Sequence, residues 1–218
     1  MVPIYQLTEE LRFPHPSLSD PIGILAVGGD LSPQRLLLAY RHGIFPWYQE
    51  PSPILWWSPD PRLVLFPGEI RISRSLERVI RKNLFTVTVD RAFGEVIRAC
   101  AETRVETWIT PDMIEAYEAL HKLGYAHSVE SWHEGRLVGG LYGVEMGTVF
   151  FGESMFSIMS DASKVALVYL ARRLFADRGF KFIDCQTTTQ HLKRLGAREI
   201  PRKEFLERLA EAVKPNDE

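Results

Sequence analysis

The sequence contains very little cysteine: Cys100 and Cys185 are the only two, and their spacing is not that of a metal site. Two distant cysteines exclude a disulfide scaffold and are typical of a reducing compartment. No run of about 18 apolar residues occurs, which excludes a membrane-spanning helix. The first residues include prolines and acidic side chains, where a secretion signal needs a basic start and an apolar run. We therefore expect a cytoplasmic protein with no membrane partner.

The sequence also lacks an excess of positive charge. Lysine and arginine total 26 against 28 aspartate and glutamate residues, which gives a net charge of −2. This balance excludes a generally basic nucleic-acid coat but allows a local basic surface. The hydrophobic fraction of 45% and the charged fraction of 25% are typical of a globular protein and exclude a disordered chain.

Motifs for the common cofactors are missing. Neither the GxxxxGK loop of phosphate-binding enzymes nor a GxGxxG loop occurs, so the sequence does not indicate nucleotide chemistry. His121, His127 and His133 do not have the spacing of metal ligands. We therefore expect neither a metal ion nor a cofactor.

Proline divides the chain into two parts. Most of the prolines lie before residue 68, together with three of the five tryptophans. There, Ser32 and Gly43 are suited to begin and end one helix, and the prolines that follow prevent long regular elements. We predict a small irregular N-terminal domain, residues 1–60, and a larger domain, residues 61–218.

The larger domain shows alternating strand and helix patterns, which predict an α+β fold. Helices flank the expected sheet, and three successive strands joined by short turns indicate antiparallel pairing. Strands are expected at 63–66, 86–89, 126–133, 137–145, 149–152 and 181–186. Helices are expected at 73–82, 92–102, 111–123, 161–178, 191–195 and 203–213.

Four cations share one side of the helix predicted at 73–82: Arg74, Arg78, Arg81 and Lys82. Their positions correspond to i, i+4, i+7 and i+8, which places them along one face. Such a face is often simply solvated. In a chain with net negative charge, the local segregation also favours a polyanion such as a nucleic-acid backbone.

Two short segments carry polar residues next to apolar ones. Glu153 follows the strand predicted at 149–152, where partial burial would perturb its pKa, although a helix cap or a rim position also explains a glutamate there. Asp184 and Gln186 are expected on one face of a buried strand, with Cys185 in the core on the other face. Because buried polar groups need partners, this pair indicates either a reactive site or a satisfied structural network.

Several strings in the sequence carry a family resemblance. They are GGDLSPQRLLLAYRHGIFPW, PILWWSPDPR, TWITPDM, FGESMF, DASKVAL, IDCQ and LGAREIPR. In this order they resemble the bacterial leucyl/phenylalanyl-tRNA–protein transferase family over nearly the whole chain. The resemblance implies transfer of leucine, phenylalanine or methionine from aminoacyl-tRNA to proteins that begin with arginine or lysine, which marks them for degradation. It also implies a small N-terminal domain joined to a catalytic domain of the GNAT acyltransferase type. The resemblance does not fix the oligomeric state, and we expect a monomer.

The resemblance assigns roles to individual residues. Asp184 and Gln186 match positions of amine activation, and Glu153 matches a position of acceptor binding. We expect Gln186 to orient the amine and Asp184 to polarise it. The four cations of the helix at 73–82 match a patch that contacts the tRNA acceptor stem. The residues expected to bind the donor amino acid are Leu141, Phe150, Met155 and Ile183. Those expected at the tRNA-proximal edge of the pocket are Tyr40, Trp47, Trp108 and Tyr117.

Two other functions remain open at this point. An acyl-CoA-dependent GNAT acetyltransferase would share the fold, but the loop that holds the pyrophosphate of CoA is replaced here by FGESMFSIMSDAS. A non-catalytic tRNA-binding module would share the basic helix. Binding of CoA would favour the first, and tRNA affinity without transfer would favour the second.

Overall fold

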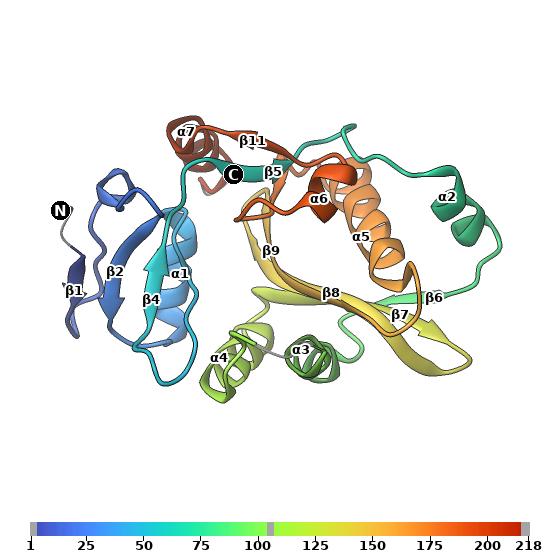
Figure 1. Cartoon of the computed structure of the whole chain (residues 1–218), viewed down its shortest axis with the longest axis horizontal. Helices are drawn as coiled ribbons and strands as arrows, with labels where there is room; N and C mark the ends of the chain where they lie inside the picture. The colour runs from blue at the N-terminus through green and yellow to red at the C-terminus, as the bar shows by residue number, and fades with distance from the viewer. Residues whose placement is uncertain (1–3, 104–106, 215–218) are drawn as a thin grey trace.

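The computed structural model describes residues 4–103 and 107–214 of the chain. Its first 57 residues include a small sheet with strand order β1-β2-β4-β3 (Figure 1). This part contains β1 (Tyr5–Leu7), η1 (Pro16–Leu18), β2 (Ile24–Gly28), α1 (Pro33–Arg41), β3 (Phe45–Pro46) and β4 (Leu55–Trp57). The prolines keep every strand to five residues or fewer, as expected, but the sheet itself was not predicted.

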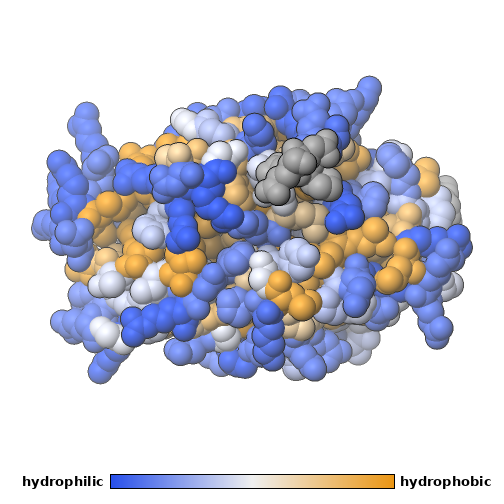
Figure 2. Space-filling model, turned by 180° about the vertical axis from the view of Figure 1, so that it is seen from behind, coloured by the Kyte–Doolittle hydropathy of each residue, from blue (hydrophilic) through white to orange (hydrophobic). Residues whose placement is uncertain are grey.

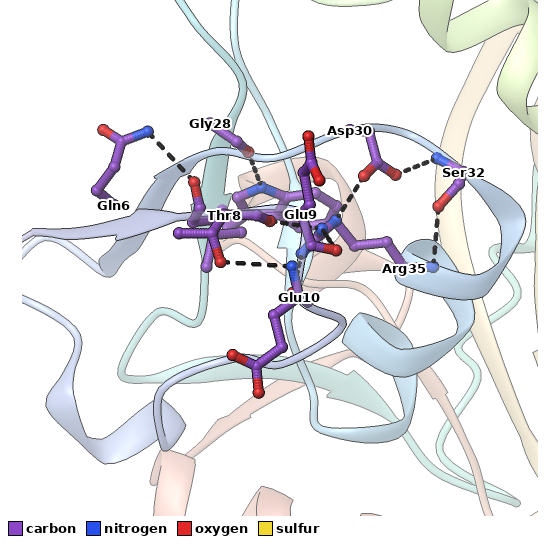
Figure 3. Close-up of polar contacts among 10 residues, drawn as sticks. Gln6, Thr8, Glu9, Glu10, Gly28, Asp30, Ser32 and Arg35 are labelled. Carbon is purple, nitrogen blue, oxygen red and sulfur yellow. Dashed lines mark hydrogen bonds and ion pairs between the residues drawn. The ribbon is translucent and has the colours of Figure 1, made fainter.

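The helix predicted in this part is confirmed with both of its ends. The side chain of Ser32 accepts a hydrogen bond from the backbone N–H of Arg35, and Gly43 follows the helix with a φ of 70°. Arg35 is fully buried and bonds to Asp30 and to backbone carbonyls of residues 8–10, as Figure 3 shows. One arginine therefore ties the N-terminal segment to α1.

A second, seven-stranded sheet has the order β11-β5-β10-β9-β8-β7-β6. All its pairs are antiparallel except β10 with β9. Its strands are β5 (Arg62–Leu65), β6 (Thr86–Val89), β7 (Ala126–His133), β8 (Arg136–Met146), β9 (Val149–Ser157), β10 (Phe182–Asp184) and β11 (Arg198–Ile200). The α+β class with a mostly antiparallel main sheet is confirmed.

Helices cover both faces of this sheet: α3 and α4 lie against one face, and α5, α6 and α2 lie on the other (Figure 1). Their bounds are α2 (Arg74–Arg81), α3 (Phe93–Glu102), α4 (Pro111–Lys122), α5 (Ala162–Arg172), η2 (Arg173–Asp177), α6 (Gln190–Arg194) and α7 (Arg202–Ala212). Every helix that the sequence predicted is present within a few residues of its expected bounds.

Two predictions about strands were wrong, and one strand was missed. β9 does not end at Gly152 but continues through Glu153 to Ser157. β10 ends at Asp184, so Gln186 is not part of the strand. β11 was not expected, because two of its three residues are exposed and give no periodic pattern.

Within the described ranges, no helix is long and apolar enough to cross a membrane, and no group of three or more potential metal-ligating side chains occurs. The face seen from behind shows hydrophobic patches between hydrophilic residues (Figure 2). Patches of this kind are normal, because polar atoms cannot cover the whole surface of a folded protein. They do not by themselves identify a binding site.

Candidate active site

A cavity of about 460 Å³ lies where β9 and β10 separate. The two strands are parallel partners up to Phe151 and Asp184, the last pair in their register. Beyond this pair β10 ends while β9 continues, so the sheet opens. Glu153 and Gln186 both line the cavity. The structure thus brings together two of the residues that the sequence indicated.

Glu153 reaches this position through a β-bulge in β9. Tyr142 pairs with Ser154 and Gly143 pairs with Gly152, which leaves Glu153 as the extra residue. A bulge redirects a side chain and is frequent beside active sites. A Cβ atom on Gly143 would lie 2.2 Å from the carbonyl oxygen of Phe151, so only glycine fits opposite the bulge.

Three donors hold the Glu153 carboxyl group. The hydroxyl of Tyr40 donates to Oε1 over 2.8 Å, and that of Tyr117 donates to Oε2 over 3.0 Å. Gln186 Nε2 donates to Oε1 over 2.7 Å. Burial raises the pKa of Glu153 to about 7, and the three hydrogen bonds only partly oppose this increase. Burial also raises the pKa of both tyrosines, so their hydroxyls remain protonated donors.

The two tyrosine hydroxyls are also hydrogen-bonded to each other. With Glu153 they form a closed triangle of three hydrogen bonds, but two hydroxyls supply only two protons. When Glu153 carries a proton, one hydroxyl can accept that proton's hydrogen bond and donate to the other tyrosine, so that each group donates once and accepts once. The site can therefore hold a protonated carboxyl group, which burial favours, while the hydroxyls that donate to the carboxylate oppose protonation.

Gln186 enters the cavity because the chain turns after β10. Its φ of 60° is left-handed, and its backbone N–H donates to Asp184 Oδ1 over 2.9 Å. The hydrogen bond from Nε2 to Glu153 fixes the orientation of the carboxamide. Its oxygen, Oε1, is the side-chain acceptor that a substrate can use. The expectation that Asp184 and Gln186 share one strand face was wrong, because this turn interrupts the alternation.

Asp184 lies outside the cavity lining and is fully buried. Arg62 binds it through two hydrogen bonds, Nε to Oδ1 at 2.9 Å and Nη2 to Oδ2 at 2.6 Å. The Arg62 guanidinium lies over the rings of Phe45 and Phe205, with its Cζ 4.8 and 4.5 Å from their centroids. Arg62 was not singled out in the sequence, and its partner is 122 positions away.

The apolar wall of the cavity agrees largely with expectation. Six predicted donor-pocket residues line it: Trp47, Trp108, Leu141, Phe150, Met155 and Ile183. Tyr40 and Tyr117 are not among the lining residues. Their hydroxyls instead donate hydrogen bonds to Glu153.

Sequence reasoning missed part of this wall. Leu167 and Leu170 of α5 line the cavity, and so does Cys185, which was expected in the core. Burial raises the pKa of the Cys185 thiol far above its usual range, so the thiol stays protonated and contributes apolar surface. The buried face of the helical pattern at 161–178 could have indicated the two leucines.

The four predicted cations lie on α2 and at its C-terminal end, and all are exposed. Leu76 fixes this helix by packing with Val165 and Val168 of α5. Within the part of the chain that the structure describes, none of the four cations forms an ion pair. Their charge is therefore available to a ligand. α2 lies on the same side of the main sheet as α5 and α6 (Figure 1).

Comparisons with known proteins match one family over most of the chain. Residues 64–210 match the family described as leucyl/phenylalanyl-tRNA protein transferase, and residues 29–60 match the N-terminal domain of that family. The protein named leucyl/phenylalanyl-tRNA–protein transferase in Syntrophobacter fumaroxidans is 65% identical, covering 97% of this chain and 92% of the relative. Those of Desulforapulum autotrophicum and Solidesulfovibrio magneticus are 54% and 59% identical, covering 95% and 97% of this chain and 92% and 87% of the relatives.

Two solved structures show a more distant likeness. A GCN5-related N-acetyltransferase from Kribbella flavida has a TM-score of 0.43 at 15% identity, covering 78% of this chain and 61% of that one. L-PGS from Bacillus licheniformis has a TM-score of 0.41 at 12% identity, covering 73% of this chain and 52% of that one. At these scores the likeness carries no argument about chemistry.

Proposed function

Because the chain belongs to the leucyl/phenylalanyl-tRNA–protein transferase family, we propose that it acts at the cavity between β9 and β10. It is an aminoacyltransferase that moves an amino acid from aminoacyl-tRNA to a protein. The acceptor is the N-terminal α-amine of a protein that begins with arginine or lysine. The observation that carries this proposal is the cavity itself, where a carboxyl group and a carboxamide adjoin an apolar slot.

The reaction needs positioning more than strong base catalysis. The ester of aminoacyl-tRNA is already activated, and an α-amine has a pKa of about 7.7–8.0, so roughly a tenth of it is neutral at pH 7. The amine nitrogen forms a bond to the ester carbonyl carbon, and the carbon–oxygen bond to the ribose breaks. The proton that leaves the amine ends on the ribose hydroxyl. No redox partner or cofactor enters this balance.

Gln186 orients the amine and Glu153 handles its proton. The hydrogen bond from Gln186 Nε2 to Glu153 leaves the carboxamide oxygen to accept an N–H of the acceptor. A neutral carboxamide is too weak a base to keep that proton. Glu153 lines the same cavity, and its pKa of about 7 is close to the pH at which it must gain and return a proton.

Asp184 acts through Gln186 rather than on the amine. Its charge is balanced by Arg62, and its contact with the reactive segment is the backbone N–H of Gln186. This geometry supports a positioning role in place of the direct polarisation of the amine that we expected from the sequence. Asp184→Asn should then lower the rate less than Gln186→Ala does, while the opposite order would restore the original assignment.

The apolar slot binds the side chain of the donor amino acid. Its walls are leucine, isoleucine and aromatic side chains with Met155, whose unbranched thioether adapts to different shapes. A difference of one methylene in such a pocket is worth only about 1–3 kcal/mol, so leucine, phenylalanine and methionine are all accepted. Branching at Cβ is excluded by shape.

The exposed cations of α2 bind the sugar-phosphate backbone of the donor tRNA. Contacts of this type position the RNA and carry little sequence preference. In the cell the reaction occurs in the cytoplasm and marks the acceptor for degradation. The protein acts as a monomer, which light scattering of the enzyme with and without tRNA would test.

A transfer assay tests the proposed function. Charged leucyl-tRNA is offered with peptides that begin with arginine, lysine or alanine, and wild type is compared with Gln186→Ala and Asp184→Ala. We expect transfer to the first two peptides only, and loss of transfer in Gln186→Ala. Gln190→Ala is the matched control, because Gln190 is exposed and is not part of the cavity lining. Binding of tRNA without any transfer by wild type would overturn the proposal.

A further inference from the structure

The rim of the cavity has one polar side. On the apolar side the lining includes Trp108 and the partly exposed Trp47, while the segment after Gln186 contributes Thr187, Thr189 and His191. A nucleoside ester with its reactive carbonyl in the cavity must carry its phosphate out over the rim. Burying a phosphate against indole rings is unfavourable because the charge loses its hydration. The polar side, formed by α6 and the loop before it, is the favourable exit.

This side is also electropositive. His191 is the only basic residue among the described residues that line the cavity. The pKa of His191 is lowered, first by burial and then by the positive charges of Lys164 on α5 and Arg194 on α6. Lys164 is itself paired with Asp161 at 2.7 Å, so among the described residues the unbalanced positive charge beside His191 is that of Arg194.

Two neighbouring cations on α6 differ in how they are engaged. Lys193 forms an ion pair with Glu199 at 3.2 Å, and Thr188 also bonds to Glu199 at 2.7 Å. Arg194 is exposed and makes no ion pair with any residue in the described ranges. Arg194 is therefore the α6 cation that can meet an incoming anion.

The position of α6 connects the cavity with the basic helix. α6, α5 and α2 lie on the same side of the main sheet, with α5 between the other two (Figure 1). A chain of phosphates that leaves the cavity over α6 and crosses α5 reaches the cations of α2.

We propose that Arg194, with His191 beside it, binds the phosphodiester that joins the last two nucleotides of the donor RNA. This inference rests on the proposed function and goes beyond it, because it defines the direction in which the RNA leaves the site. Arg194 supplies a charge-assisted hydrogen bond to the phosphate, and His191 donates a second one from its ring. Both are positioning groups for the donor.

Three donors that differ in phosphate content test the proposal: the leucyl ester of adenosine, the leucyl ester of the dinucleotide cytidylyl-adenosine, and leucyl-tRNA. The readout is the preference for the dinucleotide over adenosine, expressed as the ratio of their kcat/KM values. We expect Arg194→Ala to reduce this ratio by about tenfold, the effect of one charge-assisted hydrogen bond. His191→Gln should reduce it as well, and Arg194→Lys should retain most of it.

Lys193→Ala is the matched control, since it removes a neighbouring cation that is already paired. An unchanged ratio in Arg194→Ala, or an equal reduction in Lys193→Ala, would overturn the inference. These outcomes are distinct from failure of the proposed function, in which wild type would transfer leucine from none of the three donors.

Discussion

Glu153 is only 8% exposed, and burial holds its pKa at about 7 instead of 4.5. Between these two pH values the folded protein binds more protons at this site than the unfolded chain does. Stability therefore falls as the pH rises through this window, and the full decrease is present above pH 7. The same desolvation that makes Glu153 a useful proton acceptor thus destabilises the fold at the pH where the enzyme works.

Glu153→Gln separates stability from activity. The amide has no charge to desolvate, so we expect the variant to be more stable than wild type at pH 8 by up to roughly 3 kcal/mol. The difference should vanish below pH 4.5, where Glu153 is neutral in both states. Urea unfolding at pH 4 and pH 8 measures it, and the transfer assay should show a large decrease in rate. An equal stability difference at both pH values would contradict the assigned pKa.

The Arg62–Asp184 pair differs from Glu153, because both of its groups are buried and their opposite charges balance each other, although Arg62 Nη1 has no hydrogen-bond partner among the described residues. Arg62→Met leaves the Asp184 carboxylate buried without a counter-charge, which should destabilise the fold by about 3–5 kcal/mol. Combining it with Asp184→Asn should recover part of this stability. The free energies of unfolding of wild type, the two single variants and the double variant, measured with denaturant, form a double-mutant cycle.

Arg98→Met is the control for this cycle. Arg98 also binds a carboxylate, that of Glu118 at 2.6 Å, but its side chain is 52% exposed. Its replacement should therefore change the stability by about 1 kcal/mol or less. Equal losses of stability in Arg62→Met and Arg98→Met would show that burial does not determine how much an ion pair contributes to stability.

The sequence predicted which residues belong to the site better than it predicted which side chains they contact. The polar residues at 184 and 186 were identified because buried polar groups need an explanation. Their separate environments could not be predicted, since the left-handed turn at Gln186 breaks the strand alternation. Arg62 was missed because its interaction with Asp184 spans 122 positions and leaves no local pattern.

Among the elements, most helices and the hairpin strands were predictable from caps, glycines and periodicity. Ser73 and Thr110, for example, accept the hydrogen bonds expected of N-caps. The end of β9 was not predictable, because a bulge changes the phase of the side chains within one strand. Short strands such as β11 are defined by pairing with a distant strand and not by their own residues.

α2 offers a prediction at the scale of one element. Replacing Arg74, Arg78, Arg81 and Lys82 by alanine should weaken tRNA binding and flatten its dependence on salt. The log–log slope should change by about 0.7–0.9 for each phosphate that the variant no longer neutralises. Fluorescence anisotropy with labelled tRNA across a salt series measures this slope. Transfer from aminoacyl-adenosine, which does not reach α2, should be unchanged.

Arg12→Ala is the control for the α2 variant. Arg12 is also an exposed cation, but it lies in the N-terminal part and pairs with Glu10 at 3.1 Å. The α2 variant could instead lose the same fraction of its activity with tRNA and with aminoacyl-adenosine as donor. That result would contradict the assignment of α2 to the RNA-binding surface, because it would reflect a damaged fold.

On the scale of the whole molecule, the active site joins the two sheets. Tyr40 comes from α1 beside the small sheet, while Tyr117 and Glu153 belong to the elements of the large sheet. The small sheet ends at Trp57 and the large one begins at Arg62. The division at residue 60 stays a prediction, but a separate N-terminal domain would have to remain docked for Glu153 to keep all its donors.

Tyr40→Phe tests this connection through the pH dependence of the reaction. The hydrogen bond from Tyr40 lowers the pKa of Glu153, so its removal should raise that pKa further. If the rate needs the ionised carboxylate, the rising limb of kcat/KM against pH should move to higher pH. Tyr48→Phe is the control, since Tyr48 also crosses between the two parts but bonds to Thr110 and not to Glu153. A limb that moves equally in both variants would mean that docking of the N-terminal part, and not the Tyr40 hydroxyl, determines the acidity of Glu153.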